Sequence, residues 1–501
     1  MRGLPSKIII SEYSIREYSG SILCCMSFPL TLHDALGQRP DHGNDAPAAG
    51  RLKAWTAALS LMIATAVSVW VACSYQDDFH VYMAGAHGLF TGTLYSQSTR
   101  GDLFTYPTFA ALVFVPLAWL PSTTVAQVVW ALLNEAALLA LLTIVIRAVR
   151  PELPRRSARL WTLGLAAPSL LLDPVLLAVR HGQVDILVTV LVLWDLVGTR
   201  RLAAMTVPKG VATGLAAAVK LTPLIFVPYL LLTRRGKAAW RCLGTFAAAE
   251  AVAFAVSPAA STAYWTRDLF DYKRVGGSLG LQGLFAPTDQ SLLATLARIN
   301  HGTVPPGLQW ALTGVLGVLG VALAGYVHFR WSPFLGVALC AITGLLISPV
   351  TWTHHMIWVL PVAVYLGAAP GRPNWGRGAA AFTAVLFWVS PIWWVADTGS
   401  GPLHERGWQL IAGNSFFLWM VLLLGASAAT VLQRAGSASR RRGDRQRAAH
   451  RQRMREITDV KHETDQIGVL LADHAVYRLE ADLRWTDHTA ARLDLQERAV
   501  Q

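Results

Sequence analysis

Apolar runs of about 20 residues recur through most of this 501-residue chain, from Trp55 to Leu432. Each run is long enough to cross a hydrocarbon layer about 30 Å thick as a helix. The composition agrees, because 53% of the residues are hydrophobic and only 15% are charged, whereas soluble domains carry about 25% charged residues. The mean hydropathy is +0.41. The sequence therefore predicts an all-α integral membrane protein.

Hydropathy predicts ten membrane spans and two less regular apolar stretches. The spans are 54–73, 123–147, 159–179, 183–198, 239–257, 307–329, 333–350, 353–368, 378–396 and 409–432. Lys220 and Pro223 interrupt the stretch 203–232, which predicts two short helices in a hairpin and raises the total to about twelve crossings. The apolar part of 104–120 is short for a span and predicts a re-entrant or interfacial helix.

The distribution of basic residues predicts the orientation of these helices. Lys and Arg of short loops prefer the cytoplasm, and arginines follow the last apolar run closely, from Arg434 to Arg455. With the N-terminus in the cytoplasm and 104–120 not spanning, every major basic cluster lies on the cytoplasmic side. The expectation is a multi-pass plasma-membrane protein with both termini in the cytoplasm and its polar loops on the extracytoplasmic face.

The same reasoning divides the chain into three parts. We expect a disordered N-terminal extension over residues 1–50, a multi-span domain over 51–432 and a basic cytoplasmic tail over 433–501. The net charge of +13 lies in short loops and in this tail, which favours a membrane surface over a nucleic-acid partner. The five cysteines have neither metal-ligand spacing nor the pattern of a disulfide framework.

Four polar segments fall on the predicted extracytoplasmic face. They are Asp77-Asp78 with Tyr82 after the first span, Arg180-His181-Gly182-Gln183-Val184-Asp185 between two spans, Lys220 within its apolar hairpin, and His354-His355 at the start of another span. Polar residues at membrane depth are costly and tend to face cavities. Cations here could hold a phosphate, while a carboxylate or an imidazole could take a proton from a hydroxyl.

Two of these segments also have simpler explanations. A carboxylate beyond a span is commonly a solvated boundary residue, and a lysine can extend its ammonium to the interface. Paired histidines invite a metal site, but adjacent residues on an α-helix point about 100° apart and cannot easily share one ion. We therefore expect no metal and no cofactor, and an imidazole that acts as a base or pairs with phosphate.

Several short motifs, in this order and spacing, resemble glycosyltransferase family 87. They are Asp78-x-x-x-Tyr82, Gly92-Thr-Leu-Tyr95, Phe104-Thr-Tyr106-Pro107, His181-Gly-Gln183, Lys220-Leu-Thr-Pro223, Gln290-Ser291 and Ser348-Pro-x-x-Trp-x-His354-His355. The resemblance covers about residues 54 to 432. The chain departs from the family pattern at Pro107-Thr108, where a double proline is usual, and at Asp289, where an asparagine is usual.

The resemblance implies a GT-C-type bundle and transfer of mannose from polyprenyl-phosphate-mannose to a lipid-linked glycan of the phosphatidylinositol mannoside or lipomannan type. Inversion would give an α-linkage, with α-1,2 as the expected position. It implies Asp78 as the catalytic base, with His354 and His355 as competing candidates. The implied substrate-binding residues are Asp77, Tyr82, Tyr106, Arg180, His181, Gln183, Lys220 and Gln290, of which Arg180 and Lys220 would hold the donor phosphate.

Two other functions remain open at this point. A GT-C enzyme that uses a different polyprenyl-phosphate sugar, such as arabinose, would need nearly the same residues. A transporter or flippase for a lipid-linked sugar would also place polar groups within a multi-span bundle. The two halves of the chain show no convincing inverted repeat, which favours the enzyme over the transporter.

Overall fold

The computed structural model describes residues 46–198, 201–202, 205–271, 274–275, 283–395, 403–461 and 466–500. The chain divides into two units, Met1–Lys53 and Ala54–Gln501. Within the first unit only the start of α1 (Ala46–Ser74) is described. The predicted extension over 1–50 therefore lies outside the described residues, apart from its helical end at 46–50.

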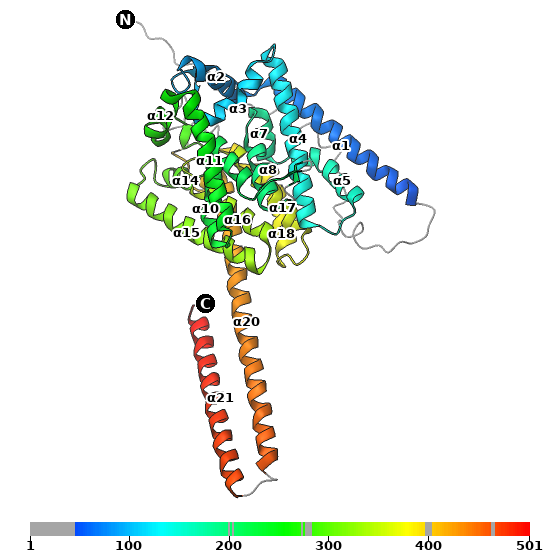
Figure 1. Ribbon diagram of the computed structural model, residues 1–501, viewed down its shortest axis with the longest axis vertical. Coiled ribbons are helices and arrows are strands. Elements are labelled where there is room, and N and C mark those ends of the chain that lie inside the picture. Colours follow the sequence, from blue (N-terminus) through cyan, green and yellow to red (C-terminus); the bar gives the residue numbers. More distant parts are fainter. Residues whose placement is uncertain are drawn as a thin grey trace. The chain divides into compact units, whose positions relative to one another are not determined.

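The second unit consists almost entirely of helices (Figure 1). After α1 they are α2 (Asp77–Thr91), α3 (Thr108–Ala118), α4 (Thr123–Val149), α5 (Arg155–Gly164), α6 (Ala166–Ser169), α7 (Asp173–His181), α8 (Asp185–Leu196), α9 (Val211–Val219), α10 (Phe226–Leu232), α11 (Gly236–Val256) and α12 (Pro258–Thr266). The later α-helices are α14 (Leu292–Ile299), α15 (Pro306–Arg330), α16 (Pro333–Ile347), α17 (Val359–Ala368), α18 (Gly376–Val389), α19 (Trp408–Gly413), α20 (Ser415–Lys461) and α21 (Gln466–Val500).

Short 3-10 helices and two strand pairs complete the described elements. The 3-10 helices are η2 (Thr222–Ile225), η3 (Asp268–Phe270), η5 (Thr353–Trp358) and η6 (Pro391–Trp394). The antiparallel strand pairs are β1 (Ser98–Thr99) with β2 (Asp102–Leu103), and β3 (Arg201–Leu202) with β4 (Met205–Thr206). The prediction of an all-α protein is confirmed for the residues that the structure describes.

Five of the described helices are long and apolar enough to cross a membrane. They are Gly50–Ser74, Thr123–Val149, Gly236–Val256, Pro306–Arg330 and Ser415–Arg434. A sixth crossing results if α7 and α8, which bend by 117° at their junction, count together as one broken span. Many large apolar side chains on their outer faces are exposed, such as Trp240 and Val318, as expected where lipid is the solvent. The chain is an integral membrane protein.

Several runs that look continuous in hydropathy are broken in the structure. The run 159–179 becomes α5, α6 and α7, with Pro168 inside α6 and Pro174 at the start of α7. The run 378–396 breaks at Ser390, whose φ is 47°, directly before Pro391. Proline lacks an N–H and restricts the residue before it, so it ends a helix without lowering the hydropathy. Apolar helices thus occur where predicted, but several are too short to span alone.

The predicted hairpin over 203–232 is confirmed. Helix α9 ends at Lys220, which is extended, and the chain then continues through η2 and α10. The start of α9 lies against the start of the next helix, α11, because a Cβ added to Gly210 would come within 2.0 Å of the carbonyl oxygen of Ala238. Lys220 therefore occupies the apex of the hairpin.

Two polar contacts fix the register of α8 against α9. At one end the Asp195 carboxylate accepts the N–H groups of Gly210 and Thr213 at 2.9 and 3.0 Å and the Thr213 hydroxyl at 2.7 Å. At the other end Lys220 Nζ lies 2.7 Å from Asp185 Oδ1. The two contacts are ten residues apart along each segment, from Asp185 to Asp195 and from Gly210 to Lys220, which is about 15 Å of helix. The cap at Asp195 thus places Lys220 opposite Asp185.

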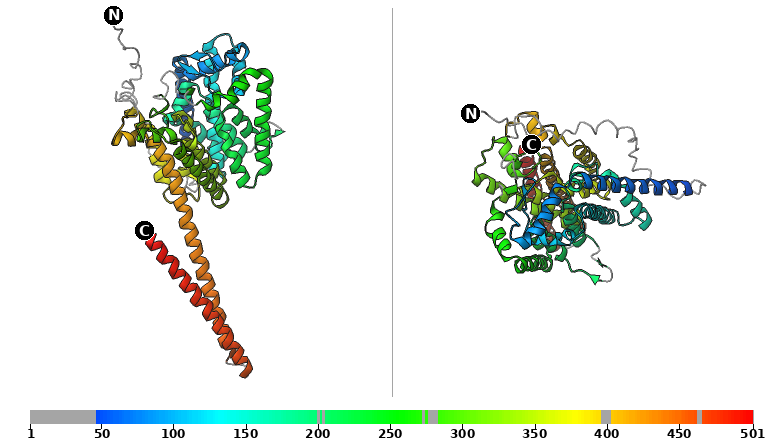
Figure 2. Two further views of the ribbon diagram at one scale, coloured as in Figure 1. Left: turned by 90° about the vertical axis from the view of Figure 1, so that its left-hand side faces the viewer. Right: turned by 90° about the horizontal axis from the view of Figure 1, so that it is seen from above.

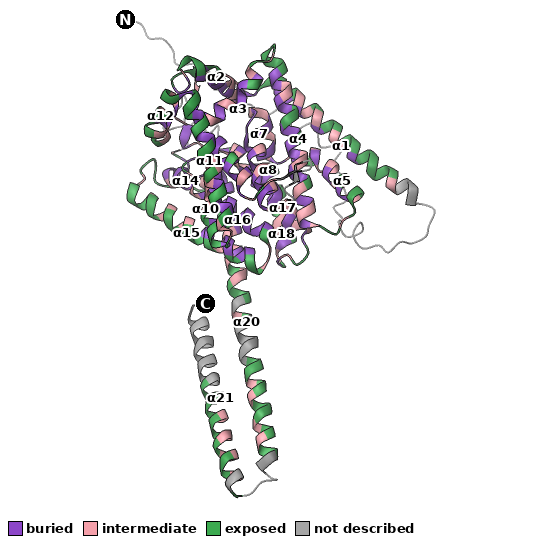
Figure 3. Ribbon diagram, in the orientation of Figure 1, coloured by how far each residue is buried: buried purple, intermediate pink, exposed green. Residues whose placement is uncertain are grey.

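The buried residues gather around α7, α8, α16 and α17 (Figure 3). Helix α20 carries the last candidate span and continues without a break through the predicted basic tail, where α21 packs against it (Figure 2). Within this unit, α20 leaves the bundle at the end opposite α2 and α3 (Figures 1 and 2). The candidate site lies between α2, α7, α9 and η5.

Replacing Asp195 tests whether this cap holds the α8–α9 pair. We expect Asp195→Ala to lower the free energy of unfolding by about 1–3 kcal/mol, because it leaves buried N–H groups without an acceptor. Thermal unfolding of the detergent-solubilised protein measures the change. Asp444→Ala, which removes an exposed carboxylate on α20, is the control and should shift stability by less than about 0.5 kcal/mol. Equal shifts in the two variants would contradict the cap.

Candidate active site

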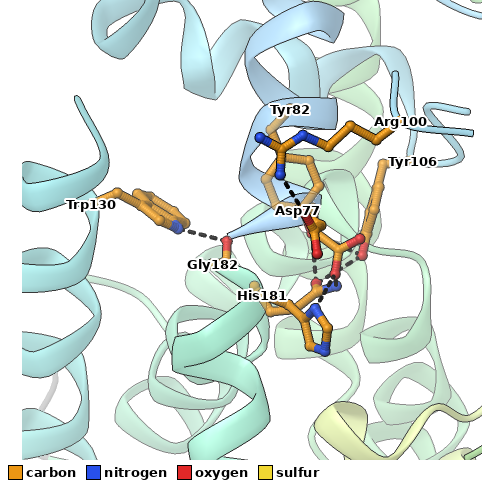
Figure 4. A network of polar contacts seen from close by, with 9 residues as sticks. Asp77, Tyr82, Arg100, Tyr106, Trp130, His181 and Gly182 are labelled. Atoms are coloured by element: carbon orange, nitrogen blue, oxygen red, sulfur yellow. Dashed lines mark hydrogen bonds and ion pairs between the residues drawn. The ribbon is translucent and has the colours of Figure 1, made fainter. Parts of the chain in front are cut away.

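Asp78 lies at the start of α2, where the chain packs against the end of α7. Gln76, just before it, has a left-handed backbone with φ 65°, and its N–H donates to the carbonyl of Arg180 at 2.8 Å. Asp78 Oδ2 accepts a hydrogen bond from Gln183 Nε2 at 2.6 Å and lies 3.9 Å from His181 Nδ1. The first turn of α2 and the α7–α8 junction therefore form one polar group (Figure 4).

The turn at the α7–α8 junction depends on Gly182. Its φ is 69°, and an added Cβ would lie 2.8 Å from Cβ of Phe79. The indole N–H of Trp130, on α4, donates to the Gly182 carbonyl at 2.6 Å (Figure 4). Only glycine combines this left-handed conformation with so close an approach. The junction therefore holds His181 and Gln183 in fixed positions beside Asp78.

Two tyrosines orient the Gln183 amide. The hydroxyls of Tyr82 and Tyr106 donate to Gln183 Oε1 at 2.6 and 3.1 Å, and in Figure 4 both rings point toward this group. Because the amide oxygen faces the tyrosines, the amide N–H₂ faces Asp78. An N–H directed at a carboxylate favours its ionised form.

The surroundings of Asp78 oppose this effect. Burial raises the pKa of the Asp78 carboxyl above its ordinary value, and His181 and the Gln183 N–H offset only part of the rise. Burial, with the nearby Asp78 and Asp77, also raises the pKa of Asp102 to about 6. A carboxylate with a raised pKa is a stronger base than a solvated one. Asp78 is thus suited to accept a proton from a hydroxyl.

A second polar group lies around Lys220. Its ammonium and the Asp185 carboxylate form a buried ion pair at 2.7 Å. Ligand atoms of Asp185, His354 and His355 all lie within 4.8 Å of one another. This group adjoins the first, because Lys220 Nζ is 5.7 Å from the centre of the Tyr106 ring, and the rings of His181 and His354 are 5.8 Å apart.

The histidine pair sits on a turn that a neighbouring loop holds in place. The N–H of Gln290 donates to the Thr351 carbonyl at 2.7 Å, and the N–H of Thr353 donates to the Thr288 carbonyl at 3.0 Å. Asp289 Oδ1 accepts the N–H of Thr351 at 2.8 Å. Segments 288–290 and 351–353 thus pair like short strands. This pairing positions His354 and His355 at the start of η5.

Three residues predicted to bind substrate make other contacts. The Gln290 amide bonds to backbone groups of Gly413 and Phe417, each at 2.7 Å. The Arg180 guanidinium lies 4.2 Å from the centre of the exposed Tyr75 ring, and Asp77 forms an exposed ion pair with Arg100. None of these contacts reaches the groups around Asp78 and Lys220. A substrate contact for these three residues stays a prediction.

A cavity between α8, η2, α16 and η5 begins at the Lys220 group. One end has the polar side chains of Asp185, Lys220 and His355. The rest of the wall is largely apolar and includes Val188, Val192, Ile225, Phe226, Ala341, Leu345 and Trp358. The cavity is only large enough for about two waters, but its lining combines a charged end with an apolar wall.

Sequence reasoning assigned no role to two carboxylates of this site, Asp185 and Asp102. Asp185 ends the predicted polar segment 180–185, and since a buried lysine in an apolar hairpin needs a counter-charge, a search for the partner of Lys220 could have assigned its role. Asp102 carried no comparable signal, since it lies on a two-residue strand in the loop after α2. Together the two polar groups offer a base at Asp78 and a cation at Lys220.

Comparison with known proteins relates this arrangement to a family. Residues 104–349 match the model of glycosyltransferase family 87. A polyprenol-phosphate-mannose-dependent alpha-(1-2)-phosphatidylinositol mannoside mannosyltransferase from Mycobacterium tuberculosis is 30% identical over 385 residues, which cover 72% of this chain and 86% of the relative. A polyprenol-phosphate-mannose-dependent alpha-(1-2)-phosphatidylinositol pentamannoside mannosyltransferase from Mycolicibacterium smegmatis is 31% identical over 362 residues, covering 70% and 84%.

No solved structure matches the chain significantly. The family match nevertheless includes Gln183 and Lys220, and the relative from Mycobacterium tuberculosis aligns with 72% of this chain. The chain belongs to glycosyltransferase family 87 and is a membrane glycosyltransferase.

Proposed function

We propose that this enzyme transfers mannose from polyprenyl-phosphate-mannose to a lipid-linked glycan of the phosphatidylinositol mannoside type, with inversion and formation of an α-1,2 linkage. The similarity to relatives named for this reaction supports the donor, the acceptor and the linkage. The observation that carries the proposal is the pairing of a base with a cation. Asp78 and Lys220 belong to adjoining polar groups, and an apolar cavity begins beside Lys220.

In the proposed reaction Asp78 takes the proton from an acceptor hydroxyl. The hydroxyl oxygen then forms a bond to C1 of mannose while the bond from C1 to the phosphate oxygen breaks. The electron pair leaves with the polyprenyl phosphate, which needs no general acid because phosphate is already a competent leaving group. A base and a leaving group on opposite faces of the sugar give inversion.

The residues around Lys220 would bind the departing phosphate. Negative charge grows on the phosphate as the C1–O bond breaks, and a preorganised cation stabilises that charge most in a water-poor site. The position of His354 and His355 beside Lys220 and Asp185 favours a role at the donor. Asp78, hydrogen-bonded to Gln183, is therefore the preferred base over either histidine.

The apolar lining beside Lys220 would contact the first part of the polyprenyl chain once this small cavity widens to admit it. Its polar end at Lys220 and His355 matches a phosphate, and its wall of Val188, Phe226 and Leu345 matches a hydrocarbon. A nucleotide-sugar donor would lack the hydrocarbon part. The cavity therefore supports a lipid-borne donor, with the mannose pointing toward Asp78.

We also propose that the site opens to the extracytoplasmic side of the plasma membrane. The shorter apolar helices would pair end to end to add to the five or six candidate spans, giving about twelve crossings. Lys209, Arg234 and Arg235 flank the base of the hairpin, at the end opposite Lys220. Basic residues of short loops favour the cytoplasm. The arginines after Leu432 belong to α20, which leaves the bundle at the end opposite α2. The first observation supports a cytoplasmic location for the base of the hairpin, and the second supports a cytoplasmic location for the tail.

Replacing Asp78 tests the base. We expect Asp78→Asn to lower the rate of mannose transfer at least about 100-fold, because general-base catalysis contributes about 10²–10⁴-fold. The measurement uses membranes that contain the protein, labelled polyprenyl-phosphate-mannose and phosphatidylinositol mannoside acceptors, followed by linkage analysis. Asp77→Asn removes the exposed neighbour that pairs with Arg100 and should retain far more activity. Comparable losses in the two variants, or full activity of Asp78→Asn, would contradict the assignment.

The same assay discriminates the donor sugar and the reaction class. Transfer from polyprenyl-phosphate-arabinose, with none from the mannose donor, would replace the proposed donor. Movement of the lipid-linked sugar across the membrane without glycosidic-bond formation would replace the enzyme with a transporter.

The pH dependence of transfer tests the link between Gln183 and Asp78. The base must be ionised, so the rate should fall as the pH drops through the pKa of Asp78, which is raised above its ordinary value. The Gln183 N–H lowers that pKa, and Gln183→Leu removes it. We expect the acid limb of the pH–rate profile of Gln183→Leu to move to higher pH. A lower rate with an unmoved acid limb would falsify this link.

Replacing Lys220 tests the phosphate site. Lys220→Gln keeps an N–H donor for Asp185 but removes the positive charge. We expect kcat/KM for the polyprenyl-phosphate donor to fall by at least about tenfold, because a hydrogen bond to a charged group contributes about 1.5–3 kcal/mol. Lys237→Gln, at an exposed position in the first turn of α11, is the control. An unchanged kcat/KM in Lys220→Gln would exclude Lys220 from the donor site.

A further inference from the structure

We propose that Asp185, His354 and His355 form a binding site for one divalent transition-metal ion next to Lys220. The binding of the ion follows from the geometry of these three residues. Its role, stabilisation of the departing phosphate, rests on the proposed function. The site would take Mn²⁺ or Zn²⁺.

The first argument is that three unsatisfied atoms converge. Asp185 Oδ2, His354 Nε2 and His355 Nδ1 are buried and have no hydrogen-bond partner. Asp185 and His354 are only 5% and 9% exposed. Buried polar atoms without a partner are costly, and ligand atoms of these same three residues lie within 4.8 Å of one another. One cation at their centre would satisfy all three atoms.

The second argument concerns the state of the His355 ring. Its Nδ1 is buried and has no hydrogen-bond partner, so this nitrogen is available to a ligand when the ring is neutral. A neutral imidazole that donates from Nε2 presents a lone pair at Nδ1. Metal-bound histidines typically donate their other ring N–H to a carbonyl or carboxylate in this way. His355 can thus serve as a ligand through Nδ1.

The third argument concerns the directions of the two histidine rings, which on an α-helix would point away from each other. Adjacent residues on an α-helix diverge by about 100°, but His354 and His355 lie on a 3-10 turn that is kinked at Met356. Their rings lie 4.6 Å apart at 83° to each other. Metal–nitrogen bonds of about 2.0–2.1 Å then require only small side-chain rotations to close the ligands on one ion. The two histidines can share a metal through different ring nitrogens.

The fourth argument is charge balance and ligand type. The Asp185–Lys220 pair is close to neutral, so a dication would leave a net charge of about +2 facing the phosphate. That charge matches the two negative charges of a departing phosphate monoester. Two imidazoles and one carboxylate favour transition metals, whereas Mg²⁺ and Ca²⁺ prefer oxygen ligands.

Metal binding is tested on the purified full-length protein, prepared with a tag that contains no histidine. The protein is stripped with EDTA, dialysed against MnCl₂ or ZnCl₂, freed of excess metal and analysed by mass spectrometry for metal content. We expect about one ion per chain in the wild type and a loss of at least about tenfold in affinity in Asp185→Asn and His355→Ala. His87→Ala, which removes an exposed histidine on α2, should bind like the wild type. Thermal unfolding identifies any variant that has not folded.

Mannose transfer tests the role of the ion. We expect stripped wild-type protein to lose at least about tenfold in rate, with recovery on addition of Mn²⁺ or Zn²⁺ but not Ca²⁺. No stoichiometric binding, or equal binding by wild type and His355→Ala, overturns the site. Full transfer by stripped protein overturns the role of the metal and leaves the proposed function intact. Absence of transfer from both stripped and loaded protein counts against the proposed function, whereas the metal content still tests the site.

Discussion

The buried ion pair between Lys220 and Asp185 governs the arrangement of this site. An ammonium within an apolar bundle is stable only with a close counter-charge and further polar neighbours. That requirement joins the hairpin apex to the start of α8, and the Asp195 cap at the other end of α8 prevents the two helices from sliding. His354 and His355 then complete the surroundings of Asp185. A single electrostatic constraint thus assembles three segments that are remote in sequence.

The second polar group depends on backbone geometry more than on charge. Gly182 allows the sharp junction of α7 and α8, and Trp130 holds its carbonyl. The junction delivers Gln183, whose amide faces two tyrosines on one side and Asp78 on the other. The two tyrosines therefore influence the pKa of Asp78 indirectly, because they fix the orientation of the Gln183 amide. A side chain at position 182 would displace Phe79 and so disturb Asp78 indirectly.

Hydropathy and the distribution of basic residues were enough to predict which segments meet. They placed Asp78, His181, Lys220 and His354 on one face, and the structure brings these residues into adjoining groups. Hydropathy does not detect the loss of helical N–H groups at Pro168 or Pro391, so it predicted continuous spans where the chain breaks. The type of a polar residue also does not reveal what its side chain contacts. Gln290 was predicted to bind substrate, but its amide bonds to backbone groups that the local path of the chain brings near it.

The histidine pair shows how local backbone form changes the chemistry available to the same residues. On an α-helix the two rings would point about 100° apart, and only one of them could face Asp185. The pairing of 288–290 with 351–353 instead forces a 3-10 turn, which brings both rings toward Asp185. In the proposed reaction the site would separate two tasks in space, because negative charge that leaves with the donor would meet the Lys220 group while the proton would move to Asp78. The separation is not complete, because Lys220 also lowers the pKa of Asp78 against the rise that burial causes.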